Sequence, residues 1–253
     1  MTVPKFAKNT RLGRVYEVPG FDQPMPSVTN VIRKMAAPGL EKWKQEQVAL
    51  AAYRGHDWRD TDEETGVEMI LAAGRSYSRK AALRGTKIHE LIESGVDLAD
   101  PEFLPFLVGA AAVWGTLGER YASEITLVST KYGYAGTADE VTHRLERPSE
   151  LSVTDWKTTK EDKSVGWREH QLQLAALSQC DAHLTDDGEL LELDHQITEL
   201  RVVGLRPDST YEIRQLDDPN RIAKLHAAFL GLLDVWELER DYPWLEIWED
   251  SSP

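Results

Sequence analysis

Three short segments with strand character follow one another closely in the middle of this chain, and they limit its fold more than any other feature. Residues 124–129 alternate between polar and apolar side chains with period two, and residues 138–145 and 151–157 are also predicted as strands. Sequential strands with short connections tend to pair with one another. The simplest arrangement of the three segments is therefore an antiparallel meander.

Helical patterns surround this meander. Residues 1–26 are rich in proline and glycine and are predicted to form an irregular arm with a short strand near 14–18. Segments with helical periodicity or capping residues are 31–35, 40–54, 64–83, 87–94, 101–122, 166–183 and 217–239, and two further predicted strands are 199–205 and 210–216. This order indicates an α/β or α+β layer arrangement. We expect α/β, with a central mixed sheet flanked by helices and a helical N-terminal part.

Several local predictions in the helical part can be checked against a structure. Ser27 to Asn30 offer capping residues for the helix that follows. Gly85 and Thr86 are predicted to separate two helices, with Thr86 capping the second. In the segment 40–54, the candidate buried residues are Leu40, Trp43, Val48, Leu50 and Ala51.

No convincing linker interrupts the chain, so we predict a single domain over residues 1–253. It consists of a mainly helical part (1–122), a sheet-containing core (123–240) and an acidic tail (241–253). No stretch approaches the roughly 18 to 20 apolar residues that span a bilayer, and the N-terminus lacks the apolar region of a secretory signal. Cys180, the single cysteine, excludes an intramolecular disulfide and is predicted as a small core residue on a helix. These features predict a reducing, cytoplasmic setting without a membrane.

Charge is unevenly distributed along the chain. The formal net charge of −14 argues against tight non-specific coating of DNA, because coating needs several phosphate neutralisations at once. Residues 1–90, however, contain 15 Lys and Arg against 11 Asp and Glu, whereas residues 91–253 contain 14 against 32. Such asymmetry between the halves is a hint of a surface that binds a polyanion.

Asp155-Trp156-Lys157 closes the third predicted strand. Residues i and i+2 of a strand face the same side, so Asp155 and Lys157 project together. A carboxylate beside an ammonium group suits a site where a hard metal ion binds and a water is activated. A plain ion pair at a strand end has the same pattern, so the motif alone does not separate the two.

Gly136-Thr137-Ala138-Asp139 places a second carboxylate at the start of the preceding predicted strand. If the two strands pair as a hairpin, Asp139 lies near Asp155. Two carboxylates this close repel one another unless a cation lies between them, and Mg²⁺ prefers oxygen ligands. The alternative is that Asp139 is only a turn residue.

Four more polar residues are candidates for the same site. Glu124, on the first predicted strand, could add a third carboxylate or be a solvated edge residue. His89 could contribute from the helical part or be a partly buried structural histidine; the zinc-protease pattern H-E-x-x-H fails because position 93 is Glu. Gln171 and Gln173, on the helix after the third strand, could reach the site or lie on plain surface.

In this order, the residues resemble the RecB-type branch of the PD-(D/E)XK nucleases. That branch has the pattern G-x-x-x-H, an upstream Glu, G-x-x-D, D/E-x-K and a helix that bears Gln. This chain offers Gly85 to His89, Glu124, Gly136 to Asp139, Asp155 to Lys157 and Gln173, within roughly residues 27–180. Each motif is weak alone, but five in the family's order form a specific joint pattern. The resemblance implies a restriction-endonuclease-like core that hydrolyses DNA phosphodiester bonds with Mg²⁺ or Mn²⁺.

The resemblance also implies a role for each residue. Asp139 and Asp155 would bind the metal ion, and His89 would be a further ligand or a phosphate contact. Lys157 would position or deprotonate the attacking water and stabilise the developing phosphate charge. Glu124 would assist the metal through a water.

Two departures from the family pattern stand out. Gln173 would orient the lysine or the DNA backbone, but the family helix carries an aromatic residue four positions later, where this chain has Leu177. The CRISPR-associated relatives hold an iron–sulfur cluster with four cysteines, and a chain with Cys180 alone is expected to have no iron–sulfur cluster. The resemblance is therefore to phage exonucleases without the cluster, which implies DNA recombination, repair or processing in a bacterial or phage-infected cell.

DNA is the expected partner, with a recombination or single-strand-binding protein as a second candidate; a ring or dimer could gather the sparse basic residues. Candidate DNA-binding residues are Arg33, Lys34, Lys42, Lys44, Arg79, Lys80, Arg84, Lys87 and Gln171. Each basic one could equally belong to a solvated helix face. The alternatives to an exonuclease are a sequence- or structure-specific endonuclease on the same core, a DNA-binding accessory protein without turnover, and an acidic structural protein whose motif matches are coincidental.

Overall fold

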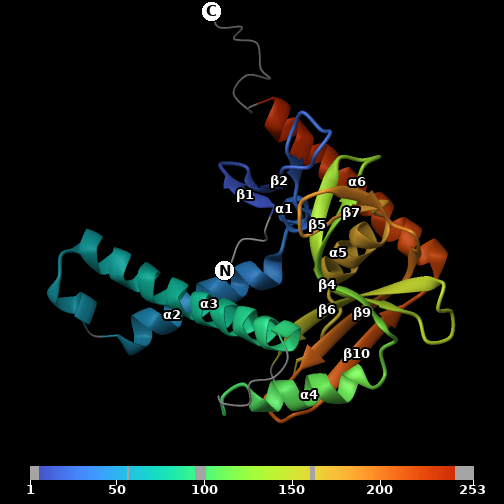
Figure 1. Ribbon diagram of the computed structural model, residues 1–253. Coiled ribbons are helices and arrows are strands. Elements are labelled where there is room, and N and C mark those ends of the chain that lie inside the picture. Colours follow the sequence, from blue (N-terminus) through green and yellow to red (C-terminus); the bar gives the residue numbers. More distant parts are fainter. Residues whose placement is uncertain (1–5, 56, 95–100, 160–162, 243–253) are drawn as a thin grey trace, which may run out of the picture. The chain divides into compact units, whose positions relative to one another are not determined.

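The computed structural model describes residues 6–55, 57–94, 101–159 and 163–242 of the chain. They form two compact units (Figure 1), one built from residues 36–90 and the other from the remaining described residues. Within these ranges, none of the helices is both long enough and apolar enough to cross a bilayer. The division of a single domain into helical part, core and tail stays a prediction, and the tail lies almost wholly outside the described residues.

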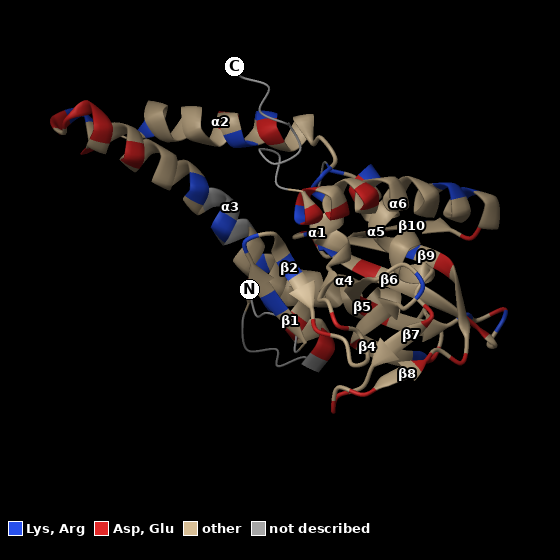
Figure 2. Cartoon of the chain, turned by 90° about the horizontal axis from the view of Figure 1, so that it is seen from above, with Lys and Arg blue, Asp and Glu red and all other residues tan. Residues whose placement is uncertain are grey.

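The first unit is helical. It contains α2 (Pro38–Arg54), the short 3-10 helix η1 (Asp57–Asp60) and most of α3 (Glu63–Ser94), whose last residues from Leu91 belong to the second unit. Charge is segregated along α3, because acidic side chains gather near its beginning and basic ones follow in its second half (Figure 2). The basic half is the part of this unit that is suited to a polyanion.

The structure corrects the predicted burial of α2. None of its residues is fully buried, including the five predicted above, and Leu40 is 49% exposed. Val48 does pack closely on α3, since a Cβ placed on Gly74 would lie 2.8 Å from Val48 Cγ2. A unit of two long helices has too little volume to enclose a whole helix face, which is why the apolar pattern overstated burial.

The predicted break at Gly85-Thr86 is wrong, because α3 is one continuous helix through both residues. Thr86 does not cap a new helix; its hydroxyl donates a hydrogen bond to the carbonyl oxygen of Ala82, one turn earlier. A glycine inside a helix costs only about 1 kcal/mol relative to alanine. In a helix of this length, the neighbouring turns offset that cost.

The second unit is built on a seven-stranded sheet with strand order β10-β9-β6-β5-β4-β7-β8 (Figure 1). The strands are β4 (Arg120–Ser129), β5 (Tyr134–His143), β6 (Glu150–Thr158), β7 (Ala182–Leu184), β8 (Leu190–Glu192), β9 (Gln196–Leu205) and β10 (Tyr211–Leu216). The predicted meander is confirmed, since β4 pairs with β5 and β5 with β6, both antiparallel. β6 and β9 are parallel, so the sheet is mixed and the fold is α/β, as predicted.

Helices cover both faces of the sheet. The helices are α1 (Val28–Ile32), α4 (Leu104–Trp114), α5 (Arg168–Ser178) and α6 (Pro219–Asp241). α5 packs on the central strands, and α1 and α6 pack on α5. Leu200 and Val202 of β9 belong to the core on the α5 side, whereas Leu205 lies against Gly109 of α4. Because side chains alternate along a strand, α4 lies on the opposite face.

The N-terminal arm forms a small sheet of its own from β1 (Ala7–Thr10), β2 (Gly13–Tyr16) and β3 (Met25–Pro26). β2 covers most of the strand predicted near 14–18. Ser27 caps α1 as predicted, because the backbone N–H of Asn30 donates to Ser27 Oγ at 3.1 Å. The helix begins three residues earlier than its apolar run because the capping residue sets its first turn.

The helix predicted over 101–122 is too long. α4 ends at Trp114, and β4 has begun by Arg120. The glycines in between permit a close chain crossing, since a Cβ on Gly118 would lie 1.8 Å from the carbonyl oxygen of His143. The end of β5 therefore lies against residues 115–119, which the apolar periodicity had predicted to be helical.

The helix predicted over 166–183 is also too long. α5 ends at Ser178, and the backbone N–H of Asp181 donates to the carbonyl oxygen of Val128 at 3.1 Å, which starts the pairing of β7 with β4. Residues 182–184 therefore pair with the edge of β4 as a strand and do not continue the helix. Cys180 is buried, as predicted, but it lies beyond the end of the helix.

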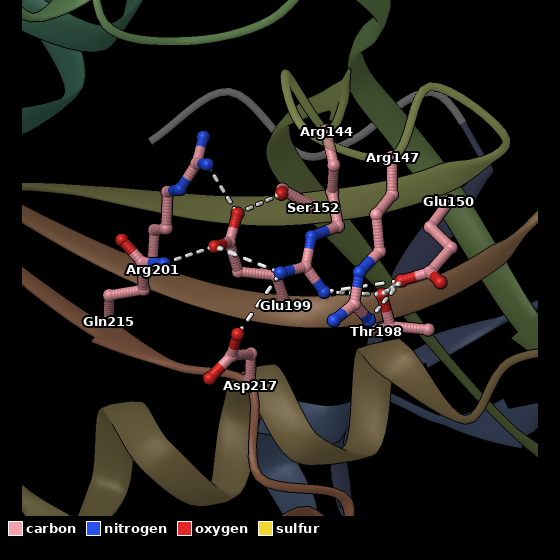
Figure 3. Close-up of polar contacts among 9 residues, drawn as sticks. All are labelled: Arg144, Arg147, Glu150, Ser152, Thr198, Glu199, Arg201, Gln215 and Asp217. Carbon is pink, nitrogen blue, oxygen red and sulfur yellow. Dashed lines mark hydrogen bonds and ion pairs between the residues drawn. The ribbon is translucent and has the colours of Figure 1, made fainter.

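A buried polar network joins β6, β9 and β10 (Figure 3). Its central carboxylate is Glu199 of β9, which is 2% exposed. Ser152 of β6 donates a hydrogen bond to this carboxylate, and Arg201 of β9 forms an ion pair with it. Arg144, just after β5, forms a second ion pair with it at 3.8 Å. A buried charge that loses its partner is costly, so this network fixes β6 and β9 side by side.

Candidate metal centre

The register of β4 and β5 places Glu124 directly opposite Asp139, because Ser123 pairs with Glu140 one step further along the two strands. A carboxylate oxygen of Glu124 lies within 4.8 Å of one of Asp139. Like charges opposite one another destabilise a strand pair, and they raise one another's pKa. A cation between the two carboxylates would remove this cost.

Glu124 has an unusual backbone. Its φ of 47° lies in the left-handed region, which residues other than glycine rarely adopt. The residue is exposed at the surface, but desolvation by the surrounding protein raises the pKa of its carboxyl to about 7, and the charges of Asp139, Glu93 and Glu140 add to this. Strained backbone and a perturbed carboxyl at the same residue are typical of functional sites.

Asp139 is held at the point where two strands part. The β5–β6 ladder ends at the pair Glu140–Thr154, and one residue further on the Asp139 carboxylate accepts the backbone N–H of Trp156 at 2.8 Å. This confirms the hairpin that brings Asp139 towards the D-x-K segment. The predicted position at the start of the strand is wrong, since β5 begins five residues earlier at Tyr134. Pairing with β4 extends the strand through the glycine turn.

Asp155 and Lys157 project together, as the strand alternation predicts. The Lys157 ammonium donates to Asp155 Oδ1 at 2.5 Å, and Gln173 of α5 donates to the same oxygen at 3.3 Å. Burial lowers the pKa of Lys157, but the charges of Asp155 and Asp139 outweigh it, so the net pKa is raised. Asp155 Oδ2 is buried and has no hydrogen-bond partner within the described ranges.

These oxygens fit a hard divalent cation. Carboxylate oxygens of Glu124 and Asp139 lie within 4.8 Å of one another, and Asp155 of the neighbouring strand has a buried oxygen without a hydrogen-bond partner among the described residues. Mg²⁺ and Mn²⁺ prefer carboxylate oxygens and retain several waters, so two or three such ligands suffice. Asp139, Asp155 and Glu124 are therefore the residues that could hold the ion.

Gln171, a candidate DNA-binding residue, forms a hydrogen bond within the protein. Its side-chain amide donates to the carbonyl oxygen of Gly166 at 2.8 Å, so it holds the loop before α5. Leu177, where the family has an aromatic residue, is buried, and a Cβ on Gly136 would lie 2.9 Å from Leu177 Cδ2. Leu177 is thus a core residue packed closely on β5.

Three residues near the site escaped the sequence prediction. Glu93 and Glu140 act on Glu124 through their charges, and Glu140 is itself paired with Arg120 at 2.9 Å. Burial raises the pKa of Glu140 to about 7, although Arg120 opposes this. His170 lies one turn before Gln173 on α5, and its Nδ1 is buried without a partner among the residues described. Helical spacing from Gln173 was the one signal that could have found it.

His89 belongs to the helical unit, and its role as a metal ligand stays a prediction. It is partly buried on α3. His89 and Glu93 are four residues apart on this helix, so they share a helix face. Glu93 belongs to the second unit, where its charge acts on Glu124.

The candidate DNA-binding residues have mixed surroundings. Arg33, Arg84 and Lys87 are exposed, whereas Lys34 is partly buried and forms an ion pair with Glu239. Exposed members also include Lys42, Lys44 and Arg79, and the side chain of Lys80 lies outside the described part of the chain. Exposure leaves most of these side chains accessible to a phosphate backbone, but contact with DNA stays a prediction.

Comparisons with known proteins leave this site unassigned. No family model matches the chain, and no curated protein matches it. Among solved structures, one described as the crystal structure of SSO0001 matches with a TM-score of 0.32 and 14% identity, over 76% of this chain and 86% of that chain. A similarity this low carries no argument about fold or function.

Proposed function

We propose that this chain is a metal-dependent DNA nuclease with a PD-(D/E)XK core of the RecB type. The observation that carries the proposal is the pair of opposed carboxylates, Glu124 and Asp139, together with Asp155, whose Oδ2 is buried without a hydrogen-bond partner in the described part of the chain. An ammonium group, Lys157, completes the set. Clustered carboxylates with an adjacent lysine are suited to phosphodiester hydrolysis, because the reaction needs a metal-activated water and positive charge near the phosphate.

Each side chain has a separate task in this proposal. Asp139 and Asp155 would bind Mg²⁺ or Mn²⁺, and Glu124 would contribute directly or through a water. A bound divalent ion lowers the pKa of a coordinated water and neutralises phosphate charge. Lys157 orients the water and stabilises negative charge on the phosphate oxygens.

Two hydrogen bonds from neighbouring residues hold the proposed metal ligands in place. Gln173 donates to Asp155 Oδ1, which holds this carboxylate in place. The backbone N–H of Trp156 holds Asp139 in the same way. Such supporting hydrogen bonds orient metal ligands and tune their affinity.

The DNA would follow basic side chains on a protein that is acidic as a whole. The second half of α3 carries exposed Arg79, Arg84 and Lys87, and Arg33 lies just after α1. With few phosphate contacts, binding should be weak and should fall with salt. We propose an exonuclease in DNA recombination, repair or processing in a bacterial or phage-infected cytoplasm, with an endonuclease on the same core as the alternative.

The direct test is digestion of end-labelled DNA with Mg²⁺ or Mn²⁺. Wild type should release labelled nucleotides from linear DNA, and Lys157→Ala should lower kcat by about 10²–10³, since it removes a charge that acts at the phosphate. Lys224→Ala is the matched control, because Lys224 is an exposed lysine on α6. Cleavage of closed circular DNA at a comparable rate would favour the endonuclease.

Two results would contradict the proposal. One is equal activity of wild type and Lys157→Ala. The other is no cleavage of any DNA by wild type with either metal, on single-stranded, double-stranded, linear and circular substrates.

A further inference from the structure

A small cavity lies beside the candidate metal centre, and the proposed hydrolysis does not use it. Its volume is about 270 Å³, and it is lined by the last turn of α3, by α4 and by Arg120 at the start of β4. All of these residues belong to the second unit. Its walls are apolar except for two charged side chains, Glu93 and Arg120.

Both charged groups of the cavity are connected to the metal centre. Arg120 Nε donates to Glu140 Oε1 at 2.9 Å, and Glu140 directly follows Asp139 in β5. The charge of Glu93 acts on Glu124. The cavity therefore lies close to the carboxylates that are proposed to bind the metal, and its two charged groups act on that site.

The aromatic wall of the cavity is Trp114, the last residue of α4. The Arg120 guanidinium lies over its indole, 4.6 Å from the ring centroid. The rings of Trp114 and Trp156 are 5.6 Å apart, and Asp139 holds the backbone of Trp156. An aromatic ring with a guanidinium over its face is thus packed against the residue between Asp155 and Lys157.

We propose that this cavity receives one unstacked nucleobase of the strand whose phosphate lies at the metal centre. Bases stack on aromatic side chains and on arginine guanidinium groups. Arg120 offers hydrogen-bond donors and Glu93 offers acceptors, which together match the polar edge of a base. The volume lies at the lower limit of small-molecule pockets, which begin near roughly 300 Å³, so it suits a single ring system.

This assignment rests on the proposed nuclease function and narrows its substrate. Bases inside a duplex are paired and stacked, and a base that enters a pocket must first leave the stack. Leaving the stack is easiest in a single strand or at a frayed end. The enzyme should therefore degrade single-stranded and unpaired ends faster than blunt, fully paired ones.

The test fills the cavity without removing its aromatic wall. Ala111 lines the cavity and Ala112 does not, while both are exposed on α4, so Ala111→Leu and Ala112→Leu are matched variants that should both fold. The substrates are two end-labelled single strands that differ only in abasic sites replacing the terminal bases. The metal-dependent kcat/KM of wild type and of each variant is measured on both strands.

Wild type and Ala112→Leu should prefer the strand with bases by about tenfold or more, as loss of a stacked base implies. Ala111→Leu should lower kcat/KM on that strand to the abasic level and leave the abasic strand unaffected. Cleavage of both strands at equal rates by all three proteins would overturn the nucleobase pocket alone. No metal-dependent cleavage by wild type of any DNA would overturn the proposed function, and the pocket with it.

Discussion

Glu124 and Asp139 face one another across β4 and β5 with carboxylate oxygens within 4.8 Å, and Glu124 has a left-handed backbone. This arrangement is unfavourable without a cation for two reasons, repulsion between like charges and backbone strain. Glu124 takes part in both the charge repulsion and the backbone strain, so it is the most informative residue to change.

Glu124→Gly should stabilise the metal-free protein and abolish its response to metal. Glycine adopts φ 47° without steric cost and removes the repulsion, so the free energy of unfolding should rise by about 1–3 kcal/mol. Mg²⁺ or Mn²⁺ should raise the Tm of wild type but not of the variant. Ser209→Gly is the control, because Ser209 also has positive φ, at 67°, in a turn outside the site. A metal response that survives in Glu124→Gly would be evidence against this ligand.

Asp139 is expected to serve both the fold and the metal, and two substitutions separate these tasks. Asp139→Asn keeps an oxygen that can accept the Trp156 N–H, so it should fold normally and lose metal-dependent activity. Asp139→Ala leaves that N–H without its partner and should cost about 1–3 kcal/mol in addition. Urea unfolding and metal titration measure the two effects. Equal stability of both variants would show that the N–H contact is not needed.

Gln173 should affect catalysis more than folding. Its amide is the α5 contact to Asp155, so Gln173→Ala should lower metal affinity or kcat by about 10- to 100-fold. Gln179→Ala changes an exposed glutamine at the end of the same helix and should leave both quantities unaltered. If Gln173→Ala loses activity only in proportion to its loss of folded protein, the proposed orienting role is wrong.

The buried network around Glu199 should dominate stability at its end of the sheet. Glu199→Ala leaves Arg144 and Arg201 buried without their shared partner, which typically costs about 3–5 kcal/mol. Lys8→Ala is the comparison, since it breaks an exposed ion pair with Glu17 that is worth at most about 1 kcal/mol. Chemical unfolding of both variants checks the difference, and similar losses would contradict it.

His226 should make stability depend on pH. Tyr134 donates its hydroxyl to the Ala176 carbonyl oxygen, so the His226 Nε2–H donates to Tyr134, and burial lowers the pKa of His226 below 6.5. Its stabilising contribution is complete above the unfolded pKa and is lost as pH falls towards the folded pKa. His226→Gln should therefore lose less free energy of unfolding than wild type between about pH 7 and pH 5. Parallel losses in both proteins would exclude His226 as the cause.

The sequence predicted those features that depend on neighbouring residues. Period-two alternation located the meander and put Asp155 and Lys157 on one face, and Ser27 marked the start of α1. It failed where distant segments decide the outcome. Pairing with β4, for example, turned residues 182–184 into a strand.

In the candidate site, too, local features were predictable from the sequence and features that depend on distant segments were not. Proximity of Asp139 to the D-x-K segment followed from a hairpin, which is local. The opposition of Glu124 and Asp139 depends on strand register, and the contribution of Glu93 depends on where α3 ends, so neither could be derived from spacing. The metal ion itself, the DNA and the role of His89 remain predictions.

The parallel pairing of β6 with β9 has a consequence for the order in which the protein matures. Asp155 pairs with Val202, which leaves the ribosome only after α5, β7 and β8 have been made. Until then β6 has one open edge, and the segment that bears Asp155 and Lys157 is incompletely supported. Long-range pairings of this kind form late in folding. In a nascent chain, the segment that bears Asp155 and Lys157 would thus gain its second neighbouring strand only once β9 has been made.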